Sequence, residues 1–134
     1  MSYFDCYLIP VPTGKMDAYK SFSRRMARIY REYGALRIVD CVLDEGVSDG
    51  TQFHAEGAQD QVRDAQLRDF KTAAATEEGE TVILSWTEWP SKEARDTLLP
   101  RVLADPRVQP QDGEETIFEG ARLVAGGFFK LLQT

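Results

Sequence analysis

Six residues on predicted strands have side chains that could bind a ligand or take part in acid–base chemistry. They are Asp5, Tyr7, Arg37, Asp40, Trp86 and Glu88. Charged groups on a strand need partners wherever another layer covers them. Because the third strand of the sheet expected below lies between the first and the second, we expect Asp5, Arg37 and Glu88 to meet on one face. A carboxylate beside an arginine in a dry interior would bind a small polar ligand or act as an acid or base.

The same three charged residues also have a structural interpretation, which is an ion pair at a dimer interface. A single β-bulge would reverse the face that each residue occupies, so the spacing leaves both interpretations open. Tyr3 and Tyr7 share a strand face with Asp5, because alternate residues of a strand point the same way. Their hydroxyls could donate hydrogen bonds to a ligand, whereas aromatic side chains at such positions more often fill a core or an interface.

Other residues capable of chemistry are few and badly spaced. His54 is the only histidine, and no second histidine or cysteine stands at ligand spacing, so we expect no metal site. Cys6 and Cys41 lie on strands that a third strand separates by about 10 Å, too far for a disulfide, and we expect both to be buried small hydrophobes. The chain has no glycine-rich phosphate loop and no Gly-x-Ser-x-Gly elbow. We therefore expect no cofactor.

The composition limits the class of protein. The chain has 134 residues, of which 43% are hydrophobic, and this fits one domain with a substantial core. Its formal net charge of −6 would repel a phosphate backbone, so nucleic acid is not an expected partner. No apolar run approaches the roughly 20 residues of a membrane span, and no charged segment followed by an apolar one marks a secretory signal. With only two cysteines, we expect a cytoplasmic protein.

The first half of the chain predicts a strand, a helix and a strand. Residues 3–11 are apolar, aromatic and β-branched, and they end at a turn-forming segment rich in proline. Thr13 could cap the next helix. The apolar residues of that helix recur on one face: Tyr19, Phe22, Met26, Ile29, Tyr30 and Tyr33. Gly34 suits the left-handed position that follows a helix, and residues 35–43 favour a second strand.

The second half repeats this order. Residues 81–89 are the clearest strand of the chain, and Ser91 is placed to cap a helix that follows it. Pro100 should kink or split that helix, because proline lacks an N–H and clashes with the preceding turn. The pair Asp105-Pro106 should end it.

The remaining segments connect these elements. Residues 122–132 predict a last strand, in which Gly126-Gly127 allows a bulge or close packing. Residues 51–66 are polar with weak periodicity and could be an insertion loop or a poor helix. Residues 67–76 could hold a short extended piece.

Two β-α-β halves predict a single α+β domain with a ferredoxin-like fold. Such a fold has a four-stranded antiparallel sheet, here in the order 4-1-3-2, with both helices on one face. The other face is then bare. The strands at 3–11 and 81–89 nevertheless carry large apolar side chains on both of their faces. A second copy of the chain over the bare face would explain this pattern, so we expect a homodimer.

Five stretches cover most of the chain outside residues 51–66 and carry a resemblance. They are Tyr3–Tyr7, Gly34–Asp40, Ser85–Glu93, Asp105–Arg107 and Arg122–Phe128. Together they resemble the YbaA-like family of small bacterial proteins of unknown function. That family belongs to the dimeric α/β-barrel superfamily, so the resemblance implies two ferredoxin-like sheets that close one barrel, and it implies no established activity. Three features depart from the family pattern: the insertion at 51–66, Cys6 in place of a more typical glycine, and Pro100.

We therefore expect an uncharacterised homodimer that binds a small polar ligand inside its barrel. The superfamily also hosts cofactor-independent enzymes, so a monooxygenase- or isomerase-like enzyme is one alternative, by fold analogy. A purely structural or interaction dimer with a filled barrel is another. The expected partners are a second copy of the chain and, in the first interpretation, a small molecule; neither nucleic acid nor a membrane is among them.

Overall fold

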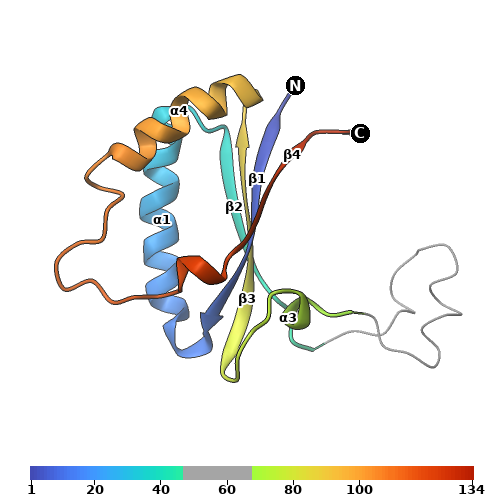
Figure 1. Cartoon of the computed structure of the whole chain (residues 1–134), viewed down its shortest axis with the longest axis vertical. Helices are drawn as coiled ribbons and strands as arrows, with labels where there is room; N and C mark the ends of the chain where they lie inside the picture. The colour runs from blue at the N-terminus through green and yellow to red at the C-terminus, as the bar shows by residue number, and fades with distance from the viewer. Residues whose placement is uncertain (47–67) are drawn as a thin grey trace, which may run out of the picture.

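Four antiparallel strands form one sheet in the computed structural model, which describes residues 1–46 and 68–134 (Figure 1). The strands are β1 (Tyr3–Pro12), β2 (Arg37–Val42), β3 (Glu80–Trp89) and β4 (Val124–Phe129). Their order is β2-β3-β1-β4, which is the order 4-1-3-2 expected from the sequence. The chain is thus of the α+β class. The segment predicted as an insertion, residues 51–66, lies outside the described residues.

Two long helices lie on one side of the sheet, α1 (Met16–Tyr33) and α4 (Lys92–Ala104), as Figure 1 shows. Helix α1 ends at Gly34, whose φ of 118° is the left-handed conformation that the sequence predicts. Ser91 caps α4 as expected, since its hydroxyl oxygen accepts a hydrogen bond of 3.0 Å from the backbone N–H of Ala94. The chain leaves the helix at Asp105, also as expected.

Two local expectations are wrong, and for Pro100 the expected split of the helix is absent. Thr13 does not cap α1: it begins the short 3-10 turn η1 (Thr13–Lys15), and its hydroxyl donates instead to the carbonyl oxygen of Gly79. The described part of the segment 67–76, residues 68–76, contains no extended piece but a helical turn, α3 (Phe70–Ala73), because the Asp69 carboxylate accepts a hydrogen bond from the backbone N–H of Thr72. Pro100 lies inside α4 without splitting it. Because Pro100 is exposed, water can bond the carbonyl oxygen that loses its partner.

Strand β4 is shorter than residues 122–132, because residues 120–122 form the 3-10 turn η3 (Gly120–Arg122). The expected close packing occurs at Gly127. The side chain of Tyr3 lies across that residue, so that any side chain at position 127 would collide with the Tyr3 hydroxyl. Position 126, in contrast, has room for a side chain at ordinary contact distance from Phe128.

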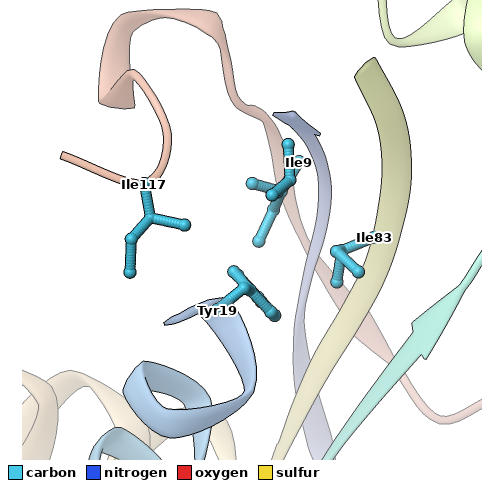
Figure 2. Close-up of a cluster of buried hydrophobic side chains, with 5 residues drawn as sticks. Ile9, Tyr19, Ile83 and Ile117 are labelled. Carbon is cyan, nitrogen blue, oxygen red and sulfur yellow. The ribbon is translucent and has the colours of Figure 1, made fainter. Parts of the chain in front are cut away.

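The core between the helices and the sheet consists of two clusters. One contains Ile9, Val11, Tyr19, Ile83 and Ile117, and Figure 2 shows Tyr19 of α1 together with Ile117, facing the isoleucines of β1 and β3. The other contains Ile29, Ala35, Trp89 and Val102. Burying such side chains stabilises the fold by about 1.5–3 kcal/mol each. The two clusters mark the ends of the helix-covered face, and the site described below lies between them.

No long helix of the described ranges covers the opposite face of the sheet, which we call the open face. Its side chains alternate in sequence with those of the core, since successive residues of a strand point to opposite sides. It carries Phe4, Cys6 and Leu8 of β1, Val39 and Cys41 of β2, Leu84 and Trp86 of β3, and Val124 and Phe128 of β4. The short helix α3 lies beside one end of β3 (Figure 1).

None of the helices in the described part of the chain is long and apolar enough to cross a bilayer.

Candidate functional site

The six residues singled out in the sequence divide between the two faces of the sheet. The expectation that Asp5 meets Arg37 and Glu88 is wrong, because Glu88 pairs with Phe4 of β1 while Asp5 pairs with Thr87. Neighbouring residues of a strand point to opposite faces, so this register separates the two carboxylates. The helix-covered face holds Asp5, Tyr7 and Asp40, and the open face holds Arg37, Trp86 and Glu88.

Asp5 is the centre of a buried structural contact. Its side chain accepts hydrogen bonds from the Nε of Arg95, at 3.2 and 3.1 Å, and from the indole Nε1 of Trp89, at 3.0 Å. The hydrogen bond to Asp5 raises the pKa of Arg95 above its ordinary value. These contacts join β1, β3 and α4 and occupy both oxygens of the carboxylate. Asp5 therefore belongs to the framework, and Arg95, which sequence reasoning missed, is its counter-charge.

A charged cluster occupies the end of the open face. Arg37 Nε lies 2.9 Å from Glu88 Oε1, and Lys130 Nζ lies 3.4 Å from Glu88 Oε2. Only 5% of Glu88 is exposed. Hydrogen bonding by Ser2, and then by Arg37 and Lys130, holds the pKa of Glu88 below its usual value despite burial. Two cations thus share one carboxylate, and the cluster has a net charge of +1.

Aromatic rings border this cluster. The guanidinium carbon of Arg37 lies 4.9 Å from the ring centroid of Trp86, and Lys130 Nζ lies 5.9 Å from that of Phe4. The rings of Phe4 and Trp86 meet edge to face at 5.5 Å. Sequence reasoning did not select Phe4 and Lys130. The alternation of the last predicted strand was a usable signal, because it places residues 128 and 130 on one face, the face that Phe4 occupies in the structure. The arrangement can hold the polar part of a small molecule against an aromatic surface.

A second candidate site is a cavity of about 280 Å³ between α1 and the helix-covered face of the sheet. Aromatic rings from Tyr7, Phe22, Tyr30 and Phe118 form part of its walls, together with aliphatic side chains. Space remains because the side chains between these rings are small, namely Ser23 and Ala27 of α1 and Ser85 and Thr87 of β3. Tyr7, Ser85 and Asp40 form one row across three neighbouring strands. Two of the six sequence-selected residues, Tyr7 and Asp40, therefore line this cavity.

Asp40 anchors three hydroxyl groups in the cavity. Its Oδ2 accepts from Tyr19 at 2.9 Å and from Ser23 at 2.6 Å, and its Oδ1 accepts from Ser85 at 2.5 Å. Burial and the neighbouring Asp40 raise the pKa of Tyr19, and burial, with a smaller contribution from Asp5, raises the pKa of Tyr7 to about 12. Both tyrosines are therefore neutral donors near neutral pH.

The hydroxyl partners of Asp40 were missed by sequence reasoning. Tyr19 and Ser23 stand four residues apart on α1, which places them one above the other on the same helix face. That spacing is visible in the sequence and could have indicated a shared contact. What it could not indicate is the strand residue opposite them.

The remaining candidates do not add chemistry to either site. Within residues 1–46 and 68–134 no group of three His, Cys, Asp or Glu side chains is arranged to hold a metal ion. His54 lies outside the described residues. Cys6 is half-buried and Cys41 is exposed, and both are free thiols. The expectation that Cys41 is buried is wrong, since no other described element covers the part of the open face that carries it.

Comparison with known proteins shows which family the sequence resembles. Residues 2–120 match the family model described as "Protein of unknown function (DUF1428)". Over 132 residues, the chain is 36% identical to the uncharacterized protein YbaA of Escherichia coli K12, and the match covers 98% of each chain. The uncharacterized protein YbaA of Shigella flexneri matches to the same extent.

Proposed function

This chain belongs to the YbaA-like DUF1428 family of proteins of unknown function, and from that premise we propose that it works as a small-molecule-binding homodimer. In this proposal, the open faces of two ferredoxin-like sheets close one α/β barrel. The charged cluster of Arg37, Glu88 and Lys130 lies inside that barrel and holds a small polar ligand. The observation that carries the proposal is this cluster, placed at the end of an otherwise apolar sheet face.

The apolar character of the open face supports a second copy as its cover. Leu84, Val124 and Phe128 are 39%, 45% and 57% exposed in one protomer. Leu84 lies on β3, and the other two lie on β4, the edge strand on the far side of β1. Contiguous apolar patches of this kind mark interaction surfaces. The open face of a second copy would suit this one, because both are apolar. Among the described residues, the only unpaired charge that either face would bring to the contact is that of the cluster of Arg37, Glu88 and Lys130.

The cluster itself supports a polar ligand. Glu88 does not pair all the hydrogen-bond donors of its two cations. The side chain of Arg37 is 60% exposed and has N–H donors beyond the single hydrogen bond to Glu88. In a closed barrel those donors would need an acceptor. A ligand with a carboxylate or another acceptor group beside a flat apolar body would fit between Arg37 and Trp86.

Light scattering after size-exclusion chromatography tests the dimer. We expect the native protein to have twice its chain mass of 15.1 kDa, and a Leu84→Arg variant to have the mass of one chain. Leu103→Arg is the matched control, since Leu103 is a half-exposed leucine on α4, away from the open face, and its variant should remain a dimer. A native protein of 15.1 kDa at micromolar concentration would refute the dimer.

Native mass spectrometry of freshly purified protein tests the ligand. We expect an additional mass on the dimer, with an occupancy that falls at least tenfold in Arg37→Met. Arg31→Met is the control, because Arg31 is an exposed arginine of the same charge on α1 and should leave the occupancy unchanged. A dimer without additional mass would remove the ligand from the proposal and leave the structural dimer. Equal occupancy in both variants would show that the ligand does not bind at the charged cluster.

A further inference from the structure

The cavity beneath α1 is a partly open pocket between the helix and the sheet. It lies between the two hydrophobic clusters, where Ser23 and Ala27 on the helix meet Ser85 and Thr87 on β3. A cavity of about 150 Å³ is enough for a benzene ring, so about 280 Å³ accommodates a ring with a short side chain.

The cavity has one formal charge on its walls, the carboxylate of Asp40. No lysine, arginine or histidine of the described residues lines it. The partners of Asp40 are three neutral hydroxyls, which donate hydrogen bonds to its two oxygens. Lys20 and Arg24 line a hollow on the outer side of Asp40, yet neither forms an ion pair with it within 4.0 Å. Among the described residues, the carboxylate therefore has no ion-pair partner within 4.0 Å.

The aromatic side chains of the walls favour the same kind of ligand as the Asp40 carboxylate, namely a cation. Tyr7, Phe22, Tyr30 and Phe118 present rings to the same space as Asp40, and the faces of aromatic rings attract cations. The tyrosines keep their protons, since burial raises the pKa of Tyr7, Tyr19 and Tyr30. An anionic ligand would meet the Asp40 carboxylate without a compensating cation, whereas a cation would be paired by it.

We propose that this cavity binds a small organic ammonium ion, with its charged nitrogen at Asp40 and its apolar body between the aromatic side chains. The site is distinct from the charged cluster on the open face, because it lies on the opposite side of the sheet. It is complete within one protomer. Its existence therefore does not depend on the dimer or on the ligand proposed above.

Three matched probes test the charge preference: 2-phenylethylammonium, the neutral 2-phenylethanol and the anionic 3-phenylpropanoate, each titrated into the native protein by isothermal calorimetry. We expect the ammonium ion to bind at least tenfold more tightly than the alcohol, and the carboxylate not to bind. In Asp40→Asn, the affinity for the ammonium ion should fall at least tenfold, to that of the alcohol. Asp112→Asn, which removes an exposed carboxylate away from the cavity, should leave all three results unchanged.

A second variant covers the case in which Asp40→Asn fails to fold. Ala27→Leu fills the cavity from α1 and retains the carboxylate and its hydroxyl partners. We expect it to abolish binding of both the ammonium ion and the alcohol, while the protein stays folded by circular dichroism. The monomeric variant Leu84→Arg should bind the ammonium ion as the native protein does. This result would separate the cavity from the proposed barrel site.

Three outcomes would overturn the proposal. One is that the three probes bind equally, or that none binds at millimolar concentration. Another is that the ammonium ion binds Asp40→Asn as tightly as the native protein. The third is that Ala27→Leu still binds it, which would place the site elsewhere. In each of these cases Asp40 serves to connect α1 to the sheet, or to pair with Lys20 or Arg24 in solution.

Discussion

At the scale of single residues, two carboxylates each accept hydrogen bonds from more than one side chain. Asp5 joins an arginine and a tryptophan, and Asp40 joins three hydroxyls. The two carboxylates lie on the same face of the sheet but differ in function. Asp5 has its counter-charge in Arg95 and is 4% exposed, which makes it part of the framework. Asp40 has no ion-pair partner within 4.0 Å among the residues described, which makes it a candidate for binding.

Removing the counter-charge of Asp5 should destabilise the fold. We expect Arg95→Met to lower the free energy of unfolding by about 3 kcal/mol, because a buried carboxylate would keep only its bond to Trp89. Chemical denaturation with urea measures this change. Arg101→Met, which alters an exposed arginine on the same helix, should change stability by no more than about 0.5 kcal/mol. Equal effects of the two variants would show that the Asp5 contact contributes little.

A second residue-scale contact makes stability depend on pH. Arg122 donates two hydrogen bonds to Glu80, at 2.8 and 2.7 Å, and this interaction lowers the pKa of Glu80 from 4.5 to about 2. Because the pKa is lower in the folded state, the contribution to stability is complete above about pH 4.5 and is lost as the pH falls toward 2. We expect the native protein to lose about 2–3 kcal/mol more than Glu80→Gln over that interval. Urea denaturation at pH 6, 4 and 3 tests this, and parallel pH profiles would contradict it.

At the scale of elements, Tyr3 of β1 and Gly127 of β4 fix how the two strands lie together. We expect Gly127→Ala to lower the free energy of unfolding by about 1–3 kcal/mol, because the new methyl group would collide with the Tyr3 side chain. Gly126→Ala is the control, since it places the same methyl group on the open face without a clash. Its stability should equal or slightly exceed that of the native protein, because alanine has less conformational freedom in the unfolded chain. A similar loss in both variants would mean that backbone conformation, and not Tyr3, determines the effect.

The elements were largely predictable from the sequence, whereas their register was not. The apolar stripe of α1, the glycine after it and the serine before α4 are local signals, and the structure confirms them. The pairing of Phe4 with Glu88 is long-range, and a shift of one residue would have put Asp5 beside Glu88 instead. The helix-side cavity was beyond prediction for the same reason. It depends on which small residue of α1 faces which small residue of β3, and this follows from packing angles that no local pattern encodes.

At the scale of the whole molecule, a dimer through the open face would link stability to concentration. The midpoint of thermal unfolding should rise as the protein concentration increases from 1 to 100 micromolar, because dissociation accompanies unfolding. The Leu84→Arg variant should show no such dependence and a lower midpoint throughout. Differential scanning calorimetry measures both. A midpoint that is independent of concentration in the native protein would argue against the dimer.

The strand order has a consequence for synthesis on the ribosome. β1 takes one neighbour from residues 80–89 and the other from residues 124–129, so each half of the chain supplies alternate strands of the sheet. β1 therefore has no partner until residues 80–89 have emerged, about four seconds or longer at a rate of 5–20 residues per second, and its second edge stays free until residues 124–129 follow. The two halves look like repeats in the sequence, but neither can form a sheet alone. During translation, an apolar strand with both edges free waits for β3, and this interval is when the nascent chain is most prone to aggregate.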